Sequence, residues 1–158
     1  MARYFEDITV GDKFAFGHYE VSEKEIVEFA EKYDPQRIHT DPTFAANSDL
    51  GGLIASGWHT AGMFMKMMVD AIMGEDSGMV SPGIDELRWV RPVRPGDILR
   101  AEGEVIGARL SQSKPDRGIV QMRYTVLNQD NQVVMSLKTN SFMRRRSHTA
   151  ADQGGNDG

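Results

Sequence analysis

The spacing of apolar and polar residues divides the chain into a helical first half and a strand-rich second half. Residues 13–21 place aromatic and aliphatic side chains between polar ones, which predicts an extended segment. The period then changes, and Ser22 and Glu25 have the spacing of a helix capping box. We expect a helix that begins at Ser22 and carries Asp34 at its C-terminal end, because Pro35 prevents continuation.

Residues 58–73 form the most apolar run of the chain. Helical spacing leaves a narrow polar stripe of His59, Lys66 and Asp70, which we interpret as a solvated face with a Lys–Asp ion pair. A helix this apolar must be buried over most of its circumference. We therefore predict one long central helix.

Alternating apolar and polar residues predict strands for most of the C-terminal half. Strands are expected at residues 84–90, 98–105, 120–126 and 133–138, with a hairpin turn at 128–131. Helices followed by antiparallel strands indicate an α+β fold with segregated layers. A single apolar helix also requires an antiparallel sheet that is wrapped around it.

Composition narrows the function classes. The 158 residues fit one domain, which we place at 1–146, and the polar, glycine-rich residues 147–158 are expected to form a disordered tail. No run of about 18 apolar residues and no signal-type N-terminus occurs, so we expect a cytoplasmic protein without membrane contact. A net charge of −5 and a pI near 5.3 argue against a nucleic-acid partner. Cysteine is absent, which leaves oxygen and imidazole groups for catalysis.

Candidate chemistry lies between the two predicted helices. Asp34 and His39 stand five residues apart in what we expect to be a loop, and Gly57 precedes the central helix. An Asp and a His can share proton transfer on one water molecule, while free N–H groups at a helix start can stabilise an oxyanion. Asp41 before Pro42 predicts the N-cap of a short helix. No histidines occur at metal-ligand spacing, so no metal is expected.

These positions resemble the hydratase motif of the MaoC-like dehydratase family, which includes the (R)-specific enoyl-CoA hydratases. The motif Asp-x-Asn-Pro-x-His matches at Asp34 and His39, followed by a glycine at the helix entry, here Gly57. Gln36-Arg37 replaces Asn-Pro. The resemblance covers about residues 8–145. It implies a hot-dog fold, with the sheet wrapped around the central helix, and a homodimer.

The resemblance also implies an activity, the reversible hydration of a 2-enoyl-CoA thioester by syn addition or removal of water. Asp34 and His39 would hold the water, and the Gly57 N–H would bind the thioester oxygen. Further residues are expected in the substrate pocket: Ser56, Trp58 and Gln36. No cofactor is needed, because coenzyme A arrives as part of the acyl-CoA substrate.

Two other functions remain open on the same fold. An acyl-CoA thioesterase would release free thiol, and a noncatalytic acyl-thioester-binding protein would bind without turnover. The replacement of Asn-Pro by Gln36-Arg37 favours the binding protein. The basic cluster 144–146 has two interpretations, either charges that terminate a strand or a contact with the phosphates of the thioester.

Overall fold

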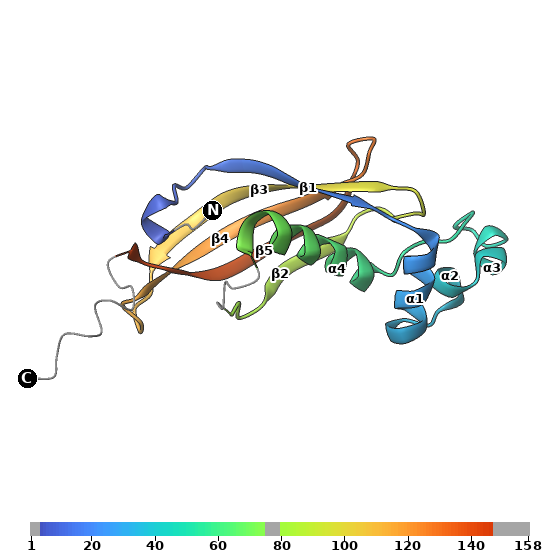
Figure 1. Ribbon diagram of the computed structural model, residues 1–158, viewed down its shortest axis with the longest axis horizontal. Helices are drawn as coiled ribbons and strands as arrows, with labels where there is room; N and C mark the ends of the chain where they lie inside the picture. The colour runs from blue at the N-terminus through green and yellow to red at the C-terminus, as the bar shows by residue number, and fades with distance from the viewer. Residues whose placement is uncertain (1–3, 75–79, 147–158) are drawn as a thin grey trace, which may run out of the picture.

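Five antiparallel strands form one curved sheet in the computed structural model, which describes residues 4–74 and 80–146 (Figure 1). The strand order across the sheet is β1-β3-β4-β5-β2. The strands are β1 (Lys13–Glu20), β2 (Ile84–Trp89), β3 (Ile98–Leu110), β4 (Arg117–Leu127) and β5 (Val133–Arg144). The predicted tail, residues 147–158, lies outside the described residues.

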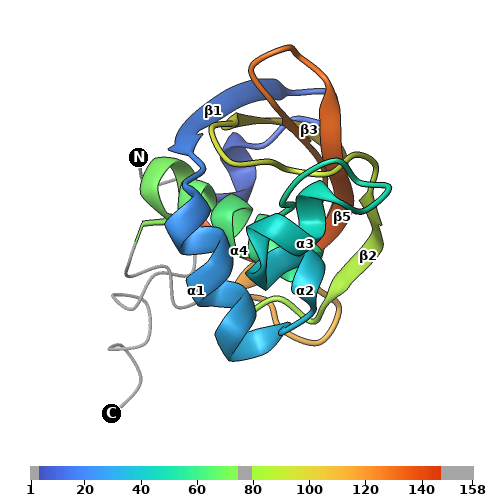
Figure 2. The same cartoon turned by 90° about the vertical axis from the view of Figure 1, so that its right-hand side faces the viewer.

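The helices occupy one side and one end of the sheet. They are α1 (Glu23–Tyr33), α2 (Arg37–Thr40), α3 (Pro42–Ala46) and α4 (Gly57–Met68), with a 3-10 turn η1 (Phe5–Asp7) before β1. A π-helical turn, η2 (Val69–Met73), extends α4, so the predicted central helix is present. Figures 1 and 2 show α4 along the sheet and α1, α2 and α3 gathered at one end. The predicted α+β class is confirmed.

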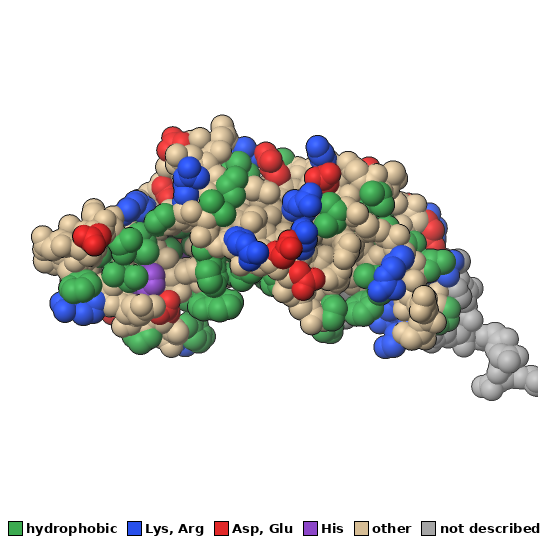
Figure 3. Space-filling model, turned by 180° about the vertical axis from the view of Figure 1, so that it is seen from behind, with side chains coloured by type: hydrophobic (Ala, Val, Ile, Leu, Met, Phe, Trp, Pro, Cys, Tyr) green, Lys and Arg blue, Asp and Glu red, His purple; other side chains and the backbone are tan. Residues whose placement is uncertain are grey.

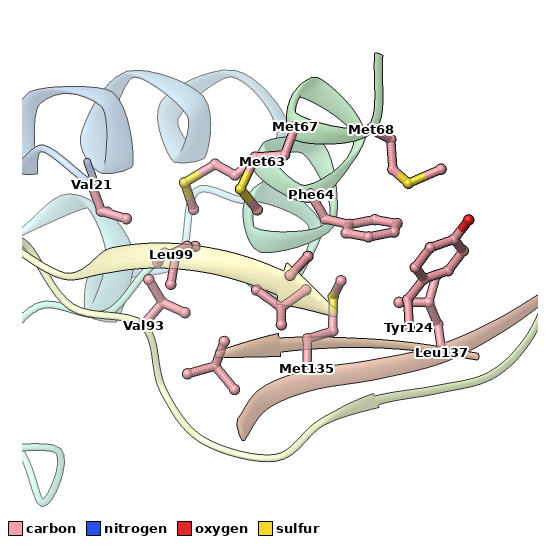
Figure 4. Close-up of a cluster of buried hydrophobic side chains, with 14 of the residues drawn as sticks. Val21, Met63, Phe64, Met67, Met68, Val93, Leu99, Tyr124, Met135 and Leu137 are labelled. Carbon is pink, nitrogen blue, oxygen red and sulfur yellow. The ribbon is translucent and has the colours of Figure 1, made fainter. Parts of the chain in front are cut away.

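The hydrophobic core lies between α4 and the sheet (Figure 4). Met63, Phe64 and Met67 of α4 are buried against strand residues such as Leu99 and Met135. Burying side chains of this size stabilises the fold by about 1.5–3 kcal/mol each. The opposite face of α4 is open in this chain, so the prediction of burial over most of the circumference was too broad: Trp58 is 60% and Met65 47% exposed.

The polar stripe predicted for α4 is confirmed at Lys66 and Asp70 and was wrong at His59. Lys66 and Asp70 form the expected ion pair, with Nζ and Oδ1 2.7 Å apart. His59, in contrast, is only 6% exposed and stacks on Phe29 of α1, with ring centroids 4.7 Å apart and an interplanar angle of 9°. The pattern of α4 alone could not show that α1 would cover its first turn.

The ends of α1 and α3 follow the sequence signals. The Ser22 side chain accepts a hydrogen bond from the Glu25 N–H, whereas the Glu25 carboxylate accepts from the Tyr19 hydroxyl at 2.7 Å, so only half of the capping box forms. Asp41 caps α3 by accepting from the Phe44 N–H, as predicted. The segment expected to be a loop contains one helical turn, α2.

Strands β3, β4 and β5 are longer than predicted, whereas β2 ends one residue earlier, at Trp89. The β4–β5 hairpin is confirmed, with Leu127 opposite Val133. Strand β3 continues past residue 105 to Leu110, although its side chains there lose their alternation of burial. Its register shifts between Val105 and Gly107, and this irregularity explains why the apolar pattern ended early while the backbone pairing continued.

Candidate active site

The C-terminus of α1 presents Asp34. The residue is the C-cap, and its N–H donates to the Ala30 carbonyl at 2.8 Å. Its carbonyl accepts from the Gln36 N–H at 2.8 Å, which turns the chain away from the helix. The Asp34 side chain is 18% exposed, so its carboxylate lies at the boundary between protein and solvent.

The second predicted residue, His39, faces Asp34 from α2. The distance from His39 Nε2 to Asp34 Oδ2 is 3.3 Å. On the other side of the ring, Nδ1 lies 2.7 Å from the carbonyl oxygen of Ile54. A carbonyl only accepts, so Nδ1 carries the hydrogen and Nε2 is the nitrogen available for proton transfer. The site therefore brings the two predicted residues together with their reactive atoms facing each other.

Two polar side chains hold the Asp34 carboxylate. The Gln36 amide donates to Oδ1 at 2.8 Å, and the Ser56 hydroxyl donates to Oδ2 at 2.7 Å. The hydrogen bonds from Gln36 and Ser56 keep the pKa of Asp34 below its ordinary value, with a further contribution from His39, although burial acts in the opposite direction. Asp34 is thus held as a carboxylate at neutral pH.

Gly57, the first residue of α4, follows Ser56 directly and lies beside this pair. The first N–H groups of a helix have no partner inside the helix, so those of α4 are oriented to bind an electron-rich oxygen. A side-chain carbon at Gly57 would collide with the indole of Trp89 from β2. The glycine therefore allows Trp89 to pack on the helix start, and the Trp58 and Trp89 rings meet edge to face at 5.0 Å.

Two other glycines lie in the loop between α3 and α4. Gly51 and Gly52 have φ of +67° and +158°, values that fit a role in loop geometry.

The side chains of Arg145 and Arg146 pair with Glu6 and Asp7 near the N-terminus. Strand β5 ends on the side of the sheet away from α1–α3 (Figure 1), and Arg145 and Arg146 follow it directly, which favours their interpretation as charges that end a strand.

Some contacts in the candidate site were missed by sequence reasoning. Trp89 was assigned only to a strand, yet it packs on the predicted oxyanion glycine. The Ile54 carbonyl that orients His39 is a backbone group, so no side-chain pattern could reveal it. At the end of the molecule that carries α1, α2 and α3, Figure 3 shows a histidine among hydrophobic side chains. Within residues 4–74 and 80–146, no group of three or more acidic, histidine or cysteine side chains could hold a metal.

Comparison with known proteins identifies the class to which this fold and site belong. The family model described as "MaoC like domain" matches residues 7–128, and the chain belongs to this family. The structure is similar to the MaoC-like dehydratase from Rhodospirillum rubrum, with a TM-score of 0.85 and 39% identity, over 92% of this chain and 99% of that one. The predicted hot-dog fold of the dehydratases is thereby confirmed.

Two further relatives are named as hydratases. The R-hydratase PhaJ1 from Pseudomonas aeruginosa superimposes with a TM-score of 0.71 and 26% identity, over 90% of this chain and 85% of that one. The mesaconyl-CoA hydratase of Cereibacter sphaeroides is 41% identical over 68 residues, 43% of this chain. The matched part is only 20% of that hydratase. In the described part of the present chain, no helix is long and apolar enough to cross a membrane.

Proposed function

We propose that this protein is a hydratase or dehydratase that acts reversibly on the double bond of a 2-enoyl-CoA thioester. The observation that carries the proposal is the convergence of Asp34 Oδ2 and His39 Nε2, 3.3 Å apart, next to the start of α4. A water molecule held by both groups would lie beside a set of unpaired helix N–H groups. Relatives named as hydratases and a dehydratase support the proposal.

The proposed reaction returns the site to its starting protonation state. In hydration, Asp34 or His39 takes a proton from the water molecule while the water oxygen bonds to the β-carbon. The electrons of the double bond then move into a thioester enolate. The α-carbon then takes a proton from the dyad on the same face. Either residue can start the transfer, because the Asp34 carboxylate and the His39 Nε2 are both unprotonated in this arrangement. Each such transfer is worth about 10² to 10⁴ in rate.

The Gly57 N–H is the proposed donor to the thioester oxygen, where negative charge develops in the enolate. One donor of this kind lowers a barrier by about 3 kcal/mol. Coenzyme A enters and leaves as part of the substrate, and the proposed reaction uses no separate cofactor. Trp58 is proposed to line the acyl pocket, because its ring is 60% exposed beside Gly57.

The first experiment follows loss of the enoyl-thioester absorbance with substrates from crotonyl-CoA to medium-chain and branched 2-enoyl-CoA. We expect Asp34→Asn and His39→Gln each to reduce kcat/KM by at least about a hundredfold while the thermal midpoint stays near that of the wild type. Asp70→Asn and His18→Gln are matched controls on exposed side chains. Full activity in both site variants would refute the assigned dyad.

A thiol-reactive dye in the same assay tests the thioesterase alternative. Hydration consumes the enoyl band without releasing thiol, whereas hydrolysis releases one thiol for each substrate. Binding without turnover over the whole panel would instead favour the noncatalytic protein. Gln36 donates an amide hydrogen bond to Asp34 Oδ1 at 2.8 Å, so its replacement of asparagine retains an amide at the carboxylate.

We also propose a homodimer joined through strand β2. This strand bonds only to β5 and forms one edge of the sheet, with exposed apolar side chains at Ile84 (54%) and Trp89 (45%). The other edge strand, β1, instead exposes polar residues such as Lys13 and Glu20. An apolar edge is a site for pairing with another strand.

Molar mass in solution, measured by light scattering after size exclusion, tests the dimer. Ile84→Lys is expected to shift the protein toward the monomer, because a charge would be buried at the paired edge. Leu110→Lys is the control, since Leu110 is similarly exposed (51%) but lies at the end of β3. A wild type that is monomeric at all concentrations would exclude the β2 dimer.

A further inference from the structure

Ser56 stands at the N-cap of α4, where a serine hydroxyl usually accepts a hydrogen bond from the helix, but here the hydroxyl bonds to Asp34 instead. It is the N-cap residue of α4, and its carbonyl accepts from the Thr60 N–H at 3.1 Å. Its side chain makes no capping hydrogen bond. Instead, the hydroxyl donates to Asp34 Oδ2 at 2.7 Å, 22 residues away in the sequence.

The side chain of Ser56 has no open side in this structure, although the sequence predicts it in the substrate pocket. The residue has 0% exposure, whereas a substrate-binding hydroxyl would need an open side. A buried hydroxyl needs a partner, and a hydrogen bond to a charged acceptor is stronger than one between neutral groups. The bond from Ser56 to Asp34 is therefore the main interaction of this side chain.

We propose that Ser56 is a positioning residue, whose hydroxyl fixes the Asp34 carboxylate toward His39 and ties it to the helix start that carries Gly57. The inference deepens the proposed function and rests on it for its catalytic part. Ser56 and Gly57 are adjacent, so one residue holds the proton-transfer group while the next presents the N–H for the thioester oxygen. The two halves of the site then keep a fixed separation.

Gln36 also donates to Asp34, but its contribution should be smaller. Gln36 is exposed, so water can replace its amide when the side chain is removed. No water can easily replace the Ser56 hydroxyl, because that residue is fully buried. We therefore expect Ser56→Ala to disturb Asp34 more than Gln36→Ala does.

The test combines kinetics with a titration that does not need activity. Loss of the Ser56 donor should reduce kcat/KM by about tenfold to a hundredfold, as for other hydrogen bonds to charged groups. It should also move the acid limb of the pH profile to higher pH, because the ionised form of Asp34 loses a donor. Ser56→Thr retains the hydroxyl, so the midpoint of its acid limb should stay at the wild-type pH. Ser48→Ala is the control, since the Ser48 hydroxyl donates to the Ala45 carbonyl.

Carboxyl ¹³C NMR on aspartate-labelled protein gives the pKa of Asp34 directly, with Asp34→Asn used to assign its signal. A higher Asp34 pKa in Ser56→Ala, but not in Ser48→Ala, supports positioning even if no enoyl-CoA is hydrated; in that case only the proposed function fails. An unchanged Asp34 titration together with an unchanged pH profile would overturn the inference, even in an active hydratase.

Discussion

The buried imidazole of His59 should make the stability of this protein sensitive to mild acid. The ring is 6% exposed, it stacks on Phe29, and its Nδ1 is buried without a hydrogen-bond partner. Burial lowers the pKa of His59 below its ordinary value of 6.5, although the charge of Glu25 acts in the opposite direction. The folded chain thus favours the neutral ring.

The sign of the effect follows from proton binding. Below about pH 6.5 the unfolded chain takes up a proton at His59 more readily than the folded chain. The stability due to the neutral ring is therefore complete above that pH and decreases as the pH falls toward the folded-state pKa. One proton changes the free energy of unfolding by at most about 1.4 kcal/mol per pH unit.

His59→Phe is the appropriate perturbation, because phenylalanine keeps a flat ring against Phe29 and cannot take up a proton. Urea unfolding at about pH 7.5 and about pH 5.5 gives the change in stability for each protein. We expect the wild type to lose about 1 kcal/mol more than His59→Phe between these conditions. His18→Gln, which removes an exposed histidine, should behave like the wild type. Equal losses in the wild type and His59→Phe would refute the reasoning.

Further substitutions test the contact between Gly57 and Trp89, the cap of α1 and the Lys66–Asp70 ion pair. Gly57→Ala should destabilise the protein by about 1–3 kcal/mol, because its new methyl group meets the Trp89 indole, and Trp89→Ala in the same chain should recover part of that loss in urea unfolding. Ser22→Ala should lower the free energy of unfolding by about 1 kcal/mol through loss of the α1 cap, measured as a shift in the urea midpoint. Lys66→Ala should change that free energy by less than about 0.5 kcal/mol, since its ion pair is solvated, and a larger change would show that the pair is coupled to the core.

Local signals predicted much of the fold. The Ser22 cap, the Asp41-Pro42 helix start and the β4–β5 hairpin each depend on residues close in sequence, and each is present. The pairing of Asp34 with His39 was also accessible, because both lie in one short segment whose spacing resembles a family motif. Contacts between residues close in sequence could therefore be predicted without knowledge of the fold.

Long-range contacts were not predictable in the same way. The Ser56–Asp34 hydrogen bond joins two helix ends, and Trp89 reaches Gly57 from the far edge of the sheet. His59 looked solvated because its own helix gives no sign that α1 packs over it. In each case the partner is determined by how separate elements pack, so periodicity within one element carries no signal.

The contact between His39 and the Ile54 carbonyl has a consequence for how the protein can diverge. The group that orients the imidazole belongs to the main chain, so substitution of the Ile54 side chain leaves the acceptor in place. A change in the size of the side chain at position 54 therefore leaves the acceptor for the His39 imidazole unchanged. The orientation of the imidazole thus depends on the main-chain path of this segment, and variation at residue 54 is compatible with the same Asp34–His39 geometry, both in natural variation and in engineering.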